Sequence, residues 1–134
     1  MCVEIFCGTA GLTAQWRRLG LRQSFGIDHK AAKACLAPVV CLDLATPSGC
    51  QLLWQLLREP CVAAVHLGPP CGTASRAREI RTQDGNDPPP LRSTKHPDGL
   101  PTLSGTDAAR VASANLLYKL TSDDACWALD NGVL

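Results

Sequence analysis

The sequence of 134 residues has little excess charge, few aromatic residues and no long apolar run. Its 13 Lys and Arg residues nearly balance its 12 Asp and Glu residues, so any nucleic-acid contact must come from a local patch. No apolar stretch approaches the ~20 residues that a membrane-spanning helix needs, so we expect no membrane partner. Segment 1–4 lacks a basic region followed by an apolar stretch, so we expect no secretory signal. Hydrophobic residues nevertheless make up 46% of the chain, enough for the core of one domain.

The eight cysteines lack the CxxC spacing that is typical of a structural zinc site, so we expect no metal. Most lie in apolar segments such as 39–42 and 61–65, where cysteine acts as a small buried hydrophobe. We therefore expect free, buried thiols in an intracellular protein, nuclear if its source is eukaryotic. Cys71 differs, because two prolines precede it and a glycine follows it.

Short apolar segments alternate with helical segments along the chain. The patterns predict strands at 2–6, 23–27, 39–42 and 61–67, and helices at 12–19, 30–36, 47–59 and 106–129. The fourth strand is nearly all apolar, which is typical of a strand buried on both faces, and we expect His66 within it to be a core residue. Segment 72–105 is polar and rich in Pro and Gly, and we expect a long flexible loop there. The alternation predicts an α/β fold with a Rossmann-like, doubly wound, mostly parallel sheet, in which 133–134 opens a fifth strand.

In such sheets, ligands bind beyond the carboxyl ends of the strands, where the strand order reverses. A strand order of 3-2-1-4 would place the first and fourth strands side by side, so that segments 7–11 and 68–75 face each other. The glycines of the first segment suit either the close approach of a cofactor or an ordinary strand-to-helix turn. Asp28 and Asp43 follow the second and third strands, where they suit either the hydroxyls and amines of a nucleoside or helix caps.

The second segment suits a nucleophile. Cys71 lies at a strand end and could act as a thiolate if its pKa were lowered, or it could be an inert turn cysteine. Arg76, Arg78 and Arg81, with Glu79 among them, suit either phosphate contacts or a solvated loop.

Taken in order, these segments resemble the DNA (cytosine-5) methyltransferase family over about residues 3–78. Segment 4–12, Glu-Ile-Phe-Cys-Gly-Thr-Ala-Gly-Leu, is similar to the first family motif, and Gly-Ile-Asp at 26–28 is similar to the second. Asp-Leu at 43–44 is similar to the third, and Gly-Pro-Pro-Cys at 68–71 is similar to the fourth, which carries the catalytic Pro-Cys pair. A looser match to the fifth motif lies at 115–118.

The resemblance implies the class I methyltransferase fold, with S-adenosyl-L-methionine as the methyl donor. The implied cofactor-binding residues are Phe6, Gly8, Thr9, Ala10, Gly11, Ile27, Asp28, Asp43, Leu44 and Pro70. Among these, Ile27 would pack on the adenine and Asp43 would accept its exocyclic amine. Cys71 would attack C6 of a flipped-out cytosine, which makes C5 nucleophilic toward the donor methyl group. Ser75, Arg76 and Arg78 would contact the nucleic acid.

Later family motifs do not occur in this sequence: a Glu-Asn-aliphatic strand end, a Gln-x-Arg segment, a target-recognition region and a closing motif. We therefore expect 1–134 to be a single partial catalytic domain, truncated at about strand five. This amino-terminal part would be inactive alone, because thiolate attack would lack its general acid. A sheet cut at this point would also expose an apolar edge beside the fourth strand.

DNA is the expected partner, with RNA left open because related cytosine-5 enzymes act on tRNA, and the complete enzyme is expected to be a monomer. One alternative is a non-catalytic relic that keeps the fold as a cofactor-binding or nucleic-acid-binding module. Another is an unrelated α/β enzyme with Cys71 as its nucleophile.

Overall fold

The computed structural model describes residues 1–80 and 87–134. The chain divides into two compact units: unit 1 comprises Met1–Pro69 and Lys119–Leu134, and unit 2 comprises Pro70–Tyr118. Arg81, one of the three arginines that the sequence places after Cys71, lies outside the described residues, as does the rest of 81–86 within the expected loop.

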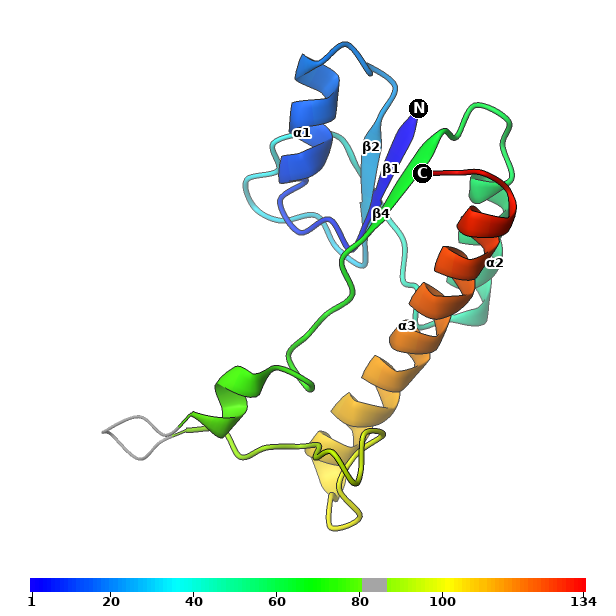
Figure 1. Cartoon of the computed structure of the whole chain (residues 1–134). Helices are drawn as coiled ribbons and strands as arrows, with labels where there is room; N and C mark the ends of the chain where they lie inside the picture. Colours follow the sequence, from blue (N-terminus) through cyan, green and yellow to red (C-terminus); the bar gives the residue numbers. More distant parts are fainter. Residues whose placement is uncertain (81–86) are drawn as a thin grey trace. The chain divides into compact units, whose positions relative to one another are not determined.

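Unit 1 is built on a four-stranded sheet in which every neighbouring pair of strands is parallel (Figure 1). The strands are β1 (Cys2–Ile5), β2 (Phe25–Asp28), β3 (Val39–Cys41) and β4 (Ala64–Leu67). Their order in the sheet is β3-β2-β1-β4, with Val3 in register with Phe25 on one side and Val65 on the other. The α/β fold with a parallel sheet is therefore confirmed, and the first and fourth strands lie side by side.

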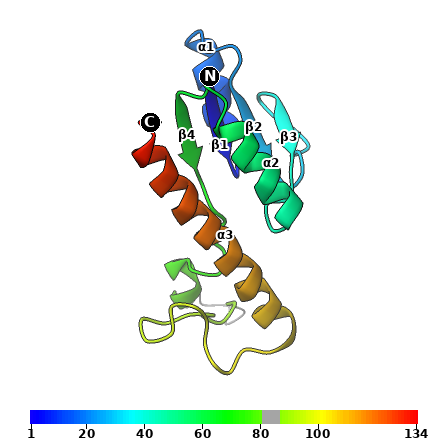
Figure 2. The ribbon, with the colours of Figure 1, turned by 90° about the vertical axis from the view of Figure 1, so that its right-hand side faces the viewer.

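Helices cover both faces of this sheet. In two perpendicular views, α1 (Gly11–Arg18) lies on one face and α2 (Pro47–Leu57) lies on the other (Figures 1 and 2). The Thr46 side chain caps α2 by accepting a hydrogen bond from the Gly49 amide at 3.1 Å. The last turns of α3 (Gly105–Asp130) pack against α2, where Trp54 and Trp127 meet edge to face. This two-layered covering is compatible with a Rossmann-like fold.

The core of unit 1 lies around β1, whose four residues are all buried. The side chains of Val3, Ile5 and Ile27 have no exposed surface, and Leu53 of α2 has none either. The central position of β1 explains this burial, because a strand between two parallel neighbours has both faces covered by helices.

The outer strands correct two expectations. β4 lies at an edge of the sheet and begins at Ala64, three residues later than predicted. It is only half-buried, and His66 is exposed and not a core residue. Cys41 in the other edge strand and Cys61 before β4 are exposed as well, so the prediction of mostly buried cysteines is wrong. Cys2 and Cys7, which belong to or follow the central strand, are buried as expected.

The helix predicted at 30–36 does not form, and turns and bends replace it. Seven residues give too few hydrogen bonds to offset helix nucleation, and the nearby Pro38 prevents extension. The Leu36 amide donates to the Thr9 carbonyl at 2.9 Å instead, which ties this segment to the loop after β1.

The last residue of the chain lies beside the free edge of β4. The Leu134 amide donates to the Ala63 carbonyl at 3.1 Å, and the Leu134 carbonyl accepts from the Val65 amide at 2.6 Å. Leu134 thus bonds to the residues on either side of Ala64, which is the hydrogen-bond pattern of two parallel strands. Segment 133–134 thus has the pairing expected of an opening fifth strand.

Unit 2 holds the 3-10 helix η1 (Arg76–Glu79), an antiparallel bridge between Ser93 and His96, and the first part of α3. Leu91, Val111 and Ala114 form its buried apolar centre. The described part of segment 72–105 therefore carries local structure of its own. Helix α3 itself runs without a break from Gly105 to Asp130, close to the bounds predicted for it.

Candidate functional site

The loop after β1 has an unusual backbone. Phe6, Gly8 and Ala10 all have left-handed conformations, with φ angles of 61°, 55° and 57°. Only glycine adopts this region freely, and each other residue there costs about 1–2 kcal/mol. The loop closes on itself through a hydrogen bond of 2.7 Å from the Ala10 amide to the Cys7 carbonyl. Two strained residues in one short loop indicate a conformation that the surrounding structure enforces, as is common at ligand sites.

Glu4 of β1 anchors the far end of this loop. It is buried, and its Oε2 accepts hydrogen bonds from the Thr13 amide at 2.7 Å and the Thr13 hydroxyl at 2.6 Å. These bonds satisfy one of the free amides at the start of α1 and hold that end of the helix against β1. The loop is therefore fixed at its exit as well as at its entry.

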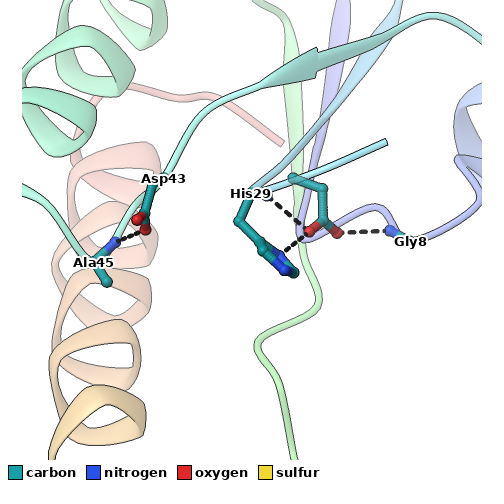
Figure 3. Close-up of polar contacts among 5 residues, drawn as sticks. Gly8, His29, Asp43 and Ala45 are labelled. Carbon is teal, nitrogen blue, oxygen red and sulfur yellow. Dashed lines mark hydrogen bonds and ion pairs between the residues drawn. The ribbon is translucent and has the colours of Figure 1, made fainter. Parts of the chain in front are cut away.

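Asp28 joins the end of β2 to the same loop. Its Oδ2 accepts a hydrogen bond from the Gly8 amide at 2.9 Å, and its Oδ1 contacts the amide and the ring Nδ1 of His29 at 2.8 and 2.7 Å (Figure 3). The bond joins the first loop to the acid at the end of the second strand. The carboxylate keeps further lone pairs for a ligand hydroxyl.

Cys7 fills the space beneath the loop. A Cβ at Gly26 would lie 2.5 Å from the Cys7 sulfur, so only glycine fits at that point of β2. Burial, and secondarily the negative charges of Asp28 and Glu4, raise the pKa of the Cys7 thiol from 9.0 to about 11. Cys7 is therefore protonated at neutral pH and acts as a packing residue, not as a nucleophile.

Asp43 stands at the exit of β3. Its Oδ1 accepts a hydrogen bond from the Ala45 amide at 2.9 Å, which shapes the entry into α2 (Figure 3). The backbone there is crowded, because a Cβ at Gly49 would lie 1.9 Å from the Asp43 carbonyl oxygen. Asp43 is exposed, so its carboxylate can also meet a ligand, whereas the neighbouring Leu44 is buried.

The Cys71 turn, residues 70–75, belongs to unit 2. The Cys71 carbonyl accepts hydrogen bonds from the amides of Ala74 at 2.9 Å and Ser75 at 2.8 Å. Cys71 itself is exposed. The turn is therefore compact in its backbone and presents its thiol to solvent, as a nucleophile requires.

Two side chains from distant parts of unit 2 hold this turn. The Tyr118 hydroxyl donates to the Pro70 carbonyl at 2.8 Å. Arg92 donates to the Thr73 hydroxyl from Nε at 3.3 Å and from Nη2 at 3.0 Å, and Thr73 is buried. A groove of about 480 Å³ lies beside the backbone of the turn, lined by Pro70 and Gly72 on one side and by Ala109 and Ser113 of α3 on the other.

The predicted nucleic-acid contacts lie on η1. The Ser75 hydroxyl accepts from the Ala77 amide at 3.2 Å and so caps this short helix. Arg76 is almost fully exposed and lies 3.6 Å from Glu79, a weak surface pair that leaves it available to a phosphate. Arg78 is half-buried, and its Nε is buried with no hydrogen-bond partner in the described part of the chain.

The structure brings part of the predicted site together. In unit 1, the loop after β1, with Thr9 and Gly11, lies at the same edge of the sheet as Asp28. The exits of β1 and β4 are adjacent as well, because the Gly68 amide donates to the Ile5 carbonyl at 3.1 Å. Ile27 and Ala10 have no exposed surface and lie in the core beneath this edge, so a contact of Ile27 with adenine stays a prediction. Pro70, Cys71 and the η1 residues belong to the other unit.

Sequence reasoning missed the residues that support these segments. Glu4 had a readable signal, because an acid inside a strand of otherwise apolar residues needs a partner. Arg92 had no such signal. Tyr118 lies in the segment 115–118 that resembles the fifth family motif, but nothing in the sequence links it to Pro70.

Comparison with protein-family models, with curated proteins and with solved structures gives no significant match. Within residues 1–80 and 87–134, no three His, Cys, Asp or Glu side chains gather where they could hold a metal ion. No helix in that part of the chain is both long and apolar enough to cross a membrane.

Proposed function

We propose that this chain carries the cofactor loop and the nucleophile of a cytosine-5 DNA methyltransferase, with the class I methyltransferase form of the parallel α/β sheet. The observation that carries the proposal is the Gly8–Asp28 hydrogen bond on a sheet of order β3-β2-β1-β4. It joins the residues that resemble the first and second family motifs at the strand ends where such sheets bind nucleotides.

The residues of unit 1 fit S-adenosyl-L-methionine. The left-handed loop 6–10 exposes Gly8 and Thr9, so a ligand can approach its backbone closely. Asp28 and Asp43 supply carboxylates at two neighbouring strand ends, suited to a ribose hydroxyl and to the adenine amine. The buried Leu44 would support Asp43 from the core.

The chain's own chemistry would be done by Cys71. Its thiolate would form a bond to C6 of a flipped-out cytosine, and the electron pair of the C5–C6 double bond would make C5 nucleophilic. S-adenosyl-L-methionine, when bound, supplies an electrophilic methyl group. Loss of the C5 proton would then restore the double bond and release the Cys71 thiolate. Ser75, Arg76 and Arg78 would hold the nucleic-acid backbone beside this turn.

The cofactor half of the proposal is tested by calorimetry with S-adenosyl-L-methionine. We expect binding by the wild-type chain and at least tenfold weaker binding by D28A, which loses the ribose acceptor and releases the Gly8 amide. The matched control is D130N, which removes an exposed carboxylate at the end of α3. The absence of any binding by the wild-type chain would contradict the proposal.

The nucleophile half is tested by covalent trapping on DNA that contains 5-fluorocytosine. The reaction contains S-adenosyl-L-methionine, because the adduct becomes irreversible only after C5 has received the methyl group and its fluorine cannot leave as a proton does. The adduct then accumulates, so that even the slow attack expected without the general acid is detected. We expect an adduct on Cys71 that C71S abolishes and that C126S, at another exposed thiol, retains. Cofactor binding without an adduct would instead identify a non-catalytic binding module of the same fold.

A further inference from the structure

The nucleophile turn is held on its N-terminal side by Tyr118. The hydroxyl of this α3 residue donates to the carbonyl of Pro70, the residue directly before Cys71, at 2.8 Å. The bond spans 48 residues of sequence. A peptide unit held through its carbonyl cannot rotate freely, so this contact restrains the backbone on the N-terminal side of Cys71.

The turn is held on its C-terminal side by Arg92. Two N–H groups of its guanidinium converge on the Thr73 hydroxyl, and a third donates to the Pro97 carbonyl at 2.5 Å. The central carbon of this guanidinium group, Cζ, lies 5.3 Å from the centre of the Tyr118 ring. Arg92 therefore contacts the turn, the following loop and the residue that holds the other side of the turn.

We propose that Arg92 and Tyr118 are positioning residues that fix the backbone on both sides of Cys71. The proposal rests on the proposed role of Cys71 as the nucleophile. Neither side chain needs to touch a substrate; together they restrict where the thiol can lie. An attack on C6 needs such restriction, because a displacement of about 1 Å can cost on the order of a hundredfold in rate.

The first test measures amide hydrogen exchange in the full chain. The amides of Ala74 and Ser75 both donate to the Cys71 carbonyl, so their exchange reports how well the turn is held. We expect Y118F, which loses only the hydroxyl, and R92K, which loses the paired donors to Thr73, to speed exchange at both amides at least fivefold. Unchanged exchange in both variants would overturn the proposal.

A matched pair at Thr73 separates positioning from general damage to unit 2. T73V keeps the shape of this buried side chain but removes the oxygen that Arg92 binds, whereas T73S keeps the oxygen. We expect T73V to speed exchange at Ala74 and Ser75 as R92K does, and T73S to stay within twofold of the wild type. Equal exchange in T73V and T73S would show that the Arg92 bond does not hold the turn.

The second test uses the trapping reaction with 5-fluorocytosine DNA. For Y118F and T73V, we expect the adduct rate at saturating DNA to fall about tenfold, while the DNA concentration for half-maximal rate changes less than twofold. T73S keeps the oxygen that Arg92 binds, so it should react at the wild-type rate. A slow reaction of T73V beside a normal reaction of T73S would assign the loss to the missing oxygen. A rate unchanged in both variants would overturn the positioning role. If the wild-type chain forms no adduct, the proposed function fails, and the exchange experiment still decides whether these contacts fix the turn.

Discussion

The first loop and the Cys71 turn are both rigid, but they are fixed by different means. The first loop is fixed by its own backbone geometry and by acids on the strands, with Glu4 nine residues from Thr13 and Asp28 20 residues from Gly8. The Cys71 turn is fixed by side chains that lie 19 and 48 residues from the residues they hold. Unit 1 supports its loop with a parallel sheet, whereas the described part of unit 2 contains no strand.

The difference shows which half of a site a sequence can reveal. Support from strands leaves a pattern, because the buried acid lies within an apolar strand and Asp28 directly follows one, where neighbouring strands bring their ends together. Support from loops and helix surfaces leaves no such pattern, because nothing in the sequence links Arg92 to Thr73 or Tyr118 to Pro70. Substitutions in each unit separately can therefore test this difference between the two kinds of support.

The largest effect on the free energy of unfolding is expected at Asp124 of unit 1. Its side chain lacks hydrogen-bond partners in the described part of the chain, unlike the buried carboxylate of Glu4. This α3 residue is 1% exposed, and neither of its carboxylate oxygens has a hydrogen-bond partner among the described residues. Burial, and secondarily the negative charge of Asp123, raises its pKa from 3.8 to about 7. The folded state therefore keeps a proton that the unfolded state loses, between about pH 4 and about pH 7.

The free energy of unfolding should fall as pH rises through that window and stay low above it, because folding then requires a buried charge. D124N removes the charge and should stabilise the protein by a few kcal/mol at pH 8, with little effect at pH 4. Urea unfolding at both pH values measures this difference, with D130N as the exposed control. Equal stabilisation of D124N at pH 4 and pH 8 would contradict the assignment.

Most of the fold could be predicted from the sequence, because short apolar segments alternate with longer helical segments and Gly or Pro residues lie between many of them. The short helix at 30–36 could not be judged, since its alanines favour a helix while Pro38 and the bond from Leu36 to Thr9 favour turns. The burial of Cys41, Cys61 and His66 was misjudged because an apolar sequence does not show which strands lie at the edges of a sheet.

The candidate site was predictable only where its residues adjoin strand ends. Asp28 and the first loop meet as the strand order implied. The left-handed conformations of Phe6 and Ala10 were not predictable, because neither residue type favours them. They follow from the need to turn the chain between β1 and α1 above the Cys7 side chain.

The second-largest effect on the free energy of unfolding is expected at Thr13, which binds the buried Glu4 carboxylate at the end of the first loop. T13V removes the hydroxyl that donates to the buried Glu4 carboxylate and leaves the Thr13 amide as its donor. Hydrogen bonds to charged groups contribute about 1.5–3 kcal/mol, so we expect a loss of about 2 kcal/mol in the free energy of unfolding. T9V, at the exposed tip of the same loop, should change stability by less than about 0.5 kcal/mol. Equal losses in urea unfolding would show that Glu4 does not anchor the loop.

A smaller effect separates the two glycines of the loop. Gly8 has a φ of +55°, so G8A should cost about 1 kcal/mol through backbone strain alone, because no atom lies within 4 Å of the added methyl group. Gly11 opens α1 with ordinary geometry and equal space, so G11A should be neutral or slightly stabilising. Thermal unfolding of both variants gives the difference. A loss in G11A as large as that in G8A would contradict the view that backbone conformation shapes this loop.

The smallest effects are expected at two exposed ion pairs of α3, one in each unit. Asp107 and Arg110 of unit 2 lie 3.3 Å apart, and Lys119 and Asp123 of unit 1 lie 2.7 Å apart. The first pair places its acid in the first turn of the helix, where the helix dipole favours negative charge, whereas the second has its base before its acid, the weaker order. We expect R110Q to cost about 0.3–0.5 kcal/mol and K119Q to cost less, although the second pair is the shorter. Urea unfolding at low and high salt measures both losses, and the loss in R110Q should shrink at high salt. A larger loss in K119Q would mean that the closer contact outweighs the position along the helix.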